Sequence, residues 1–123
     1  MTQNNLGYAL RAQASASEGP ARARLLGEAV AAYRSALEVR TREALPQDWA
    51  GTQNNLGIAL SDQASASEGP ARTRLLGEAV AAFKNAVEVF TLEFDREQHT
   101  AIVAEIKRLE AEVTKMQAES RPK

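Results

Sequence analysis

Apolar positions recur along the N-terminal part of the chain with the spacing of amphipathic helices. A short stripe of Leu6, Ala9 and Leu10 predicts a helix over residues 2–14. A longer stripe, about four helical turns in length, contains Leu25, Leu26, Ala29, Tyr33, Ala36 and Leu37. The chain is therefore expected to begin with a helical hairpin.

The segment SASEGP interrupts this periodicity between the two stripes. Ser17 or Gly19 is expected to cap the second helix, with Pro20 in its first turn. Gly27 and Gly77 lie inside predicted helices, where each costs about 1 kcal/mol relative to alanine. We therefore expect a close helix crossing at both glycines, where a side chain would not fit.

The hairpin pattern occurs twice. Residues 2–43 align without gaps to residues 52–93; ten positions differ, which leaves 32 of 42 identical. Such a match indicates a duplication. Because Pro46 suits a first helical turn, the first helix of the second copy is predicted from residue 47 to residue 64. The chain divides into repeat one, residues 1–45, and repeat two, residues 46–95.

The remaining sequence predicts a fifth helix over residues 96–118 and a disordered tail over residues 119–123, with Asp95 as a possible cap. The apolar positions of this helix step by four and three residues, as in a coiled-coil seam. The seam consists of Ile102, Ile106, Leu109, Val113 and Met116.

Repeat two becomes apolar where the fifth helix follows it. Phe90, Leu92 and Phe94 replace the Arg40, Arg42 and Ala44 of repeat one. Since repeat proteins need an end cap with a polar outer face, we expect the fifth helix to cap the array by packing its seam on Phe90 and Phe94.

Composition supports packed helices and removes several kinds of chemistry. The chain has 24 alanines, few aromatic residues, no cysteine and a single histidine, His99. It offers no thiol nucleophile and no His-rich zinc site, and its serines have no partner base. No catalytic residue, cofactor or metal site is predicted, and the chain is not expected to be an enzyme.

Charge and hydropathy limit the expected partners. The formal net charge of −1 selects neither nucleic acid nor an anionic membrane. No apolar run is long enough for a membrane span, and the N-terminus is too polar for a signal peptide. A cytoplasmic protein is expected.

The repeated residues resemble the tetratricopeptide repeat. Its first-helix signature is similar to Leu6-Gly7 with Leu10 and to Leu56-Gly57 with Leu60. Its second-helix signature is similar to Ala29, Tyr33, Ala36 and to Ala79, Phe83, Ala86. The unit here is fifty residues instead of about 34, with the extra residues around SASEGP and after the second helix. The resemblance implies one all-α domain of tetratricopeptide-like helical hairpins, an α-solenoid of two repeats plus a C-terminal capping helix.

The phrase Asn-Asn-Leu-Gly also resembles the long-repeat branch that includes the kinesin light chains. In that branch, asparagines on the first helix hydrogen-bond the backbone of an extended peptide. The resemblance implies a short version of such a ladder at Asn4 and Asn54.

The differences between the repeats indicate a surface on their first helices. These helices differ only at Tyr8/Ile58, Arg11/Ser61 and Ala12/Asp62, which share one face with the asparagine one turn earlier. An amide both donates and accepts, so it can bond a peptide backbone while its variable neighbours contact side chains. The predicted peptide-binding residues are Asn4, Tyr8, Arg11, Asn54, Ile58, Ser61 and Asp62, with Asn5 and Asn55 as secondary candidates. The alternative is that exposed positions drift and the asparagines bond local turns, each other or the adjacent helix.

Two functions stay open from the sequence. The first is a non-catalytic protein–protein interaction scaffold that binds an extended peptide segment in a concave groove of the first helices. The alternative is a fragment or assembly module of a longer repeat protein that self-associates without a separate peptide ligand. The expected partner is a protein or peptide, not nucleic acid or a membrane.

A homodimer in isolation is also expected. Repeat one starts abruptly, and no earlier helix covers its first helix. Two copies could meet through this uncovered repeat or through the seam over residues 102–116. The uncovered repeat is preferred, because a seam contact would leave Phe90 and Phe94 partly exposed.

Overall fold

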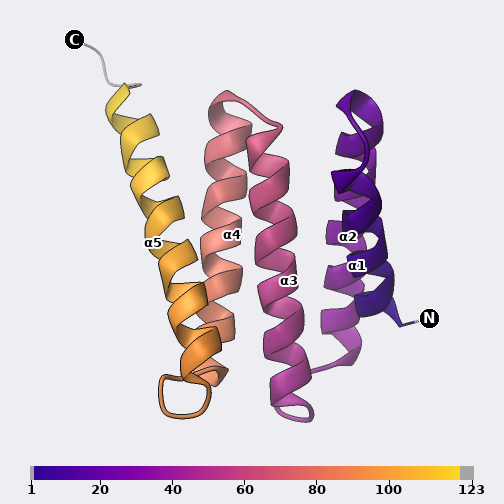
Figure 1. Cartoon of the computed structure of the whole chain (residues 1–123), viewed down its shortest axis with the longest axis vertical. Coiled ribbons are helices and arrows are strands. Elements are labelled where there is room, and N and C mark those ends of the chain that lie inside the picture. The colour runs from indigo at the N-terminus through magenta and orange to yellow at the C-terminus, as the bar shows by residue number, and fades with distance from the viewer. Residues whose placement is uncertain (1, 120–123) are drawn as a thin grey trace.

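The computed structural model describes residues 2–119 and contains, in that range, helices and no strand. The helices are α1 (Gln3–Ser15), α2 (Gly19–Val39), α3 (Pro46–Ser65), α4 (Gly69–Val89) and α5 (Arg96–Glu119). Consecutive helices run in opposite directions and each packs on the next (Figure 1). The predicted all-α class is confirmed.

Local signals in the sequence determine where several helices begin. Thr2 caps α1, since its Oγ1 accepts a hydrogen bond from the Asn5 backbone N–H at 3.2 Å. Asp95 caps α5 in the same way, accepting from the backbone N–H of Gln98 at 3.0 Å. α5 continues through Glu119, the first residue of the predicted tail, and residues 120–123 lie outside the described part of the chain.

The turn within each hairpin differs from the prediction. Ser17 does not cap α2, because its Oγ donates to the Gln13 carbonyl oxygen at 2.9 Å; Glu18 occupies the cap position. Gly19 begins α2 with a φ of +58°, and Gly69 begins α4 with a φ of +60°. A side chain is strained in this left-handed region. The glycine therefore permits a sharp turn between the helices.

The expected close crossing at Gly27 and Gly77 is wrong. A Cβ atom on Gly27 would meet only Gln63, at 3.8 Å, and one on Gly77 would meet nothing within 4 Å. Both positions have room for a methyl group, so helix packing does not require glycine there.

The close approach occurs at the glycines of the first helices instead. A Cβ on Gly7 would lie 2.6 Å from Cε1 of Tyr33, and one on Gly57 would lie 2.7 Å from Cε1 of Phe83. Both rings are buried. Each hairpin is closed by an aromatic ring that packs directly on the backbone of the opposite helix.

α5 covers the second hairpin through its seam. Ile102, Ile106 and Leu109 are buried in the same core as Phe90, and Val113 and Met116 pack partly buried against that core. The seam therefore lies within the chain and packs on α4.

The expected burial of Phe94 is wrong. Phe94 is 55% exposed and Leu92 is 49% exposed. Both residues lie in a turn before α5, where Thr91 Oγ1 accepts from the Phe94 backbone N–H at 3.2 Å. Of the three positions that become apolar in repeat two, only Phe90 enters the core.

α5 occupies the place that a further first helix would take. Its first residue, Arg96, follows Pro46 of α3 by the fifty residues of the repeat. Exposed Lys107 stands at the position of Gly57, and exposed Glu110 stands at the position of Leu60. Neither residue is suited to receive the aromatic ring of a second helix. The side of α5 away from α4 is accordingly polar.

Among residues 2–119, no helix combines the length and the apolar character that crossing a membrane requires.

Candidate functional site

The predicted site residues lie on α1 and α3, and side-chain contacts join these two helices directly. Thr52 Oγ1 and Asn55 Nδ2 both donate to Asn4 Oδ1, at 3.1 and 3.2 Å. Farther along the helices, Arg11 Nε donates to Asp62 Oδ2 at 3.0 Å. These contacts hold the first helices of the two repeats side by side.

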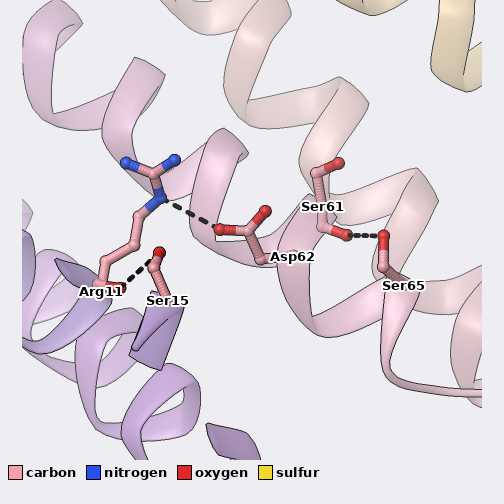
Figure 2. Close-up of polar contacts among 5 residues, drawn as sticks. All are labelled: Arg11, Ser15, Ser61, Asp62 and Ser65. Carbon is pink, nitrogen blue, oxygen red and sulfur yellow. Dashed lines mark hydrogen bonds and ion pairs between the residues drawn. The ribbon is translucent and has the colours of Figure 1, made fainter. Parts of the chain in front are cut away.

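The Arg11–Asp62 pair bridges α1 and α3 (Figure 2). Each side chain is about one third exposed, and pairs of this kind contribute about 0–1 kcal/mol. The residues equivalent by repeat are Ser61 and Ala12, so neither repeat carries both charges. Two of the three differences between the first helices therefore form one contact between the repeats.

The nearby serines make local hydrogen bonds. Ser15 Oγ donates to the Arg11 carbonyl oxygen and Ser65 Oγ donates to the Ser61 carbonyl oxygen, both at 3.2 Å (Figure 2). Ser61, a predicted site residue, is half-buried. Because these are bonds to the backbone one turn earlier, they stabilise the ends of α1 and α3.

The four asparagines have different surroundings. Asn4 accepts the two bonds from α3, and Asn55 supplies one of them, as expected if it contacts the adjacent helix. Asn5 is exposed and uses its backbone N–H in the cap at Thr2. Asn54 is half-buried, and its side chain makes no hydrogen bond within residues 2–119.

The difference between Asn4 and Asn54 follows from the helix beside each. α3 presents Thr52 and Asn55 to Asn4. At the equivalent positions α5 carries Ile102 and Glu105, and Ile102 is buried in the core. Asn54 therefore keeps both its carbonyl and its amine available.

Apolar groups lie at the remaining predicted positions. Tyr8 is 62% exposed on α1, whereas Ile58, its equivalent on α3, is half-buried and packs against the core. A flat ring and an aliphatic side chain are thus presented at equivalent places on neighbouring helices. Both are suited to contact an apolar side chain of a ligand.

Sequence reasoning missed two residues beneath this surface. Tyr33 was assigned only to the core, but its hydroxyl is buried without a hydrogen-bond partner in the described range. Burial raises the pKa of Tyr33, an effect that the charge of Arg11 opposes and Tyr8 reinforces. The signal was the Tyr33/Phe83 difference between the repeats. The contact made by Thr52 had no signal, because threonine occurs in both repeats.

The comparisons with known proteins return nothing. No protein-family model matches the chain, and no curated protein or solved structure does. The tetratricopeptide resemblance stays a prediction. Within residues 2–119, no group of three or more histidine or carboxylate side chains is placed to hold a metal ion.

Proposed function

We propose that this chain is a non-catalytic protein-interaction scaffold that binds an extended peptide segment across α1 and α3. The observation that carries the proposal is the half-buried Asn54 amide, which has no partner among residues 2–119. Buried polar groups are ordinarily hydrogen-bonded. An extended peptide offers a carbonyl and an N–H to the two ends of one amide.

The neighbouring side chains have defined roles in this proposal. Ile58, one turn after Asn54, and Tyr8 on α1 supply apolar contact to peptide side chains. Asn4 and the Arg11–Asp62 pair are engaged between α1 and α3, so they position the surface more than they bind. The site is then one backbone-binding amide flanked by apolar groups, not a uniform ladder.

The proposal includes a tetratricopeptide-like solenoid. Three observations support it: the fifty-residue offset between the hairpins, the glycine–aromatic contact at the same place in each, and the direct contact between α1 and α3. In such an array the first helices form one layer, with α5 as its third member and cap.

The proposal is tested by selecting peptides from a displayed random library on the immobilised chain. The affinity of a selected peptide is then measured by calorimetry. Asn54→Ala is expected to weaken binding by about 1–2 kcal/mol, or about five- to thirtyfold, because the peptide loses its hydrogen bonds. Asn85→Ala removes a half-buried asparagine from α4 and serves as the matched control. Equal affinities for wild type and Asn54→Ala would show that the amide does not bind peptide.

A further inference from the structure

The outer side of the first hairpin carries the residues with which the second hairpin docks on the first. We call Gln3, Leu6, Leu10, Leu25 and Glu28 of α1 and α2 the N-terminal face. The equivalents of the first four, Gln53, Leu56, Leu60 and Leu75, are between 2% and 8% exposed. In contrast, Gln3 is exposed, Leu6 is 37% exposed, and Leu10 and Leu25 are only half-buried. The same residues at the same helix positions differ in being covered.

The N-terminal face is grooved between α1 and α2. Two adjoining grooves of about 390 and 520 Å³ share Leu10 and Glu28. In repeat two, the equivalent Leu60 and Glu78 line a groove whose other wall is α2, with Gly27 and Arg34. The N-terminal face therefore has the form of a surface that packs against a helix.

The charges on this face also differ from those of the covered copy. Glu78 forms ion pairs with Arg74 of its own helix and with Arg34 of the covering helix, both at 3.7 Å. Glu28 pairs with Arg24 of its own helix at 3.6 Å and with no other cation of residues 2–119. A chain that covers the N-terminal face in the same way would place a cation beside Glu28.

We propose that a second copy of this chain covers the N-terminal face, with the two faces packed around a two-fold axis. In each copy, α3 already covers α2 and α5 covers α4, so the N-terminal face is the docking surface that a copy has left. A two-fold contact places Arg24 of one copy opposite the partner's Glu28, and does so twice. The same contact buries the Leu6 and Leu10 of both copies.

This inference is independent of the proposed function. Tyr8, Asn54 and Ile58 are not part of the N-terminal face. Peptide binding and dimer formation can therefore fail separately.

Sedimentation velocity of the full chain over a wide range of concentration tests the apolar part of the contact. The wild type is expected to be a dimer that dissociates on dilution. Leu6→Glu is expected to be a monomer with unchanged helical circular dichroism, because Leu6 is exposed within one copy. Leu92→Glu, at an exposed leucine of the α4–α5 turn, is the control and should remain a dimer. A wild-type monomer at every concentration, or a Leu6→Glu dimer as stable as the wild type, would overturn the proposal.

A charge exchange tests the two-fold arrangement itself. Arg24→Glu and Glu28→Arg each place like charges opposite one another, so each variant alone should dimerise at least about tenfold more weakly. Mixing the two variants restores both opposite-charge contacts and should produce a heterodimer. If the mixture stays as monomeric as its components, Arg24 and Glu28 do not face each other and the arrangement is wrong.

Discussion

Gly57 and Gly77 are helical residues of the same repeat with opposite surroundings. A Cβ on Gly57 would lie 2.7 Å from the buried Phe83 ring, whereas one on Gly77 would enter open space. Gly57→Ala should therefore lower the free energy of unfolding by about 1–3 kcal/mol through overpacking. Gly77→Ala should raise it by up to about 1 kcal/mol through helix propensity. Urea denaturation measures both, and effects of the same sign would contradict the packing described for Gly57.

Tyr33 differs from its equivalent Phe83 by a buried hydroxyl without a partner in the described range. Tyr33→Phe should raise the free energy of unfolding by about 1 kcal/mol, since an unpaired polar group leaves the core. Burial raises the pKa of the folded-state phenol above its ordinary value of 10.0. Above that pH the unfolded tyrosine ionises while the folded one resists, so this part of the stability is lost as pH rises. Denaturation of both proteins at neutral and alkaline pH should show a smaller alkaline loss for Tyr33→Phe; identical pH dependence would refute this assignment.

At the scale of the helices, α5 supplies part of the core. Leu109 is fully buried beside Ile102 and Ile106, so Leu109→Ala should lower the free energy of unfolding by about 2–5 kcal/mol. Thr114→Ala, at an exposed position of α5, should change it by less than about 0.5 kcal/mol. Deleting residues 96–123 should expose Phe90 and cause aggregation. Thermal denaturation and light scattering measure these effects, and a truncated chain as stable as the whole would contradict the capping role.

The sequence predicted the helices well because their boundaries depend on local signals, such as Asp95 and Pro46. It did not predict which glycines are crowded, since Gly57 and Gly77 both lie inside helices and only the position of Phe83 distinguishes them. Within the candidate site, the alignment identified Arg11 and Asp62 as differences but not as a pair. They are 51 residues apart, one more than the repeat, so their contact depends on the stagger of α1 against α3.

For the whole molecule, the account places two binding surfaces on different sides of a small array. The stability of a repeat array is approximately a sum over repeats and their interfaces, and the N-terminal face is an interface left uncovered within one copy. A dimer formed there would carry two peptide-binding surfaces. If a ligand had two binding segments, its second contact would be intramolecular and its avidity higher than for one surface.

The central claim, that a peptide binds across α1 and α3, is tested most directly by nuclear magnetic resonance. The isotope-labelled chain is titrated with a library-selected peptide, and the backbone amide shifts are mapped on the structure. The account predicts that the largest changes gather around Tyr8, Asn54 and Ile58. Changes confined to α2 and α4, with α1 and α3 unaffected at saturation, would contradict it.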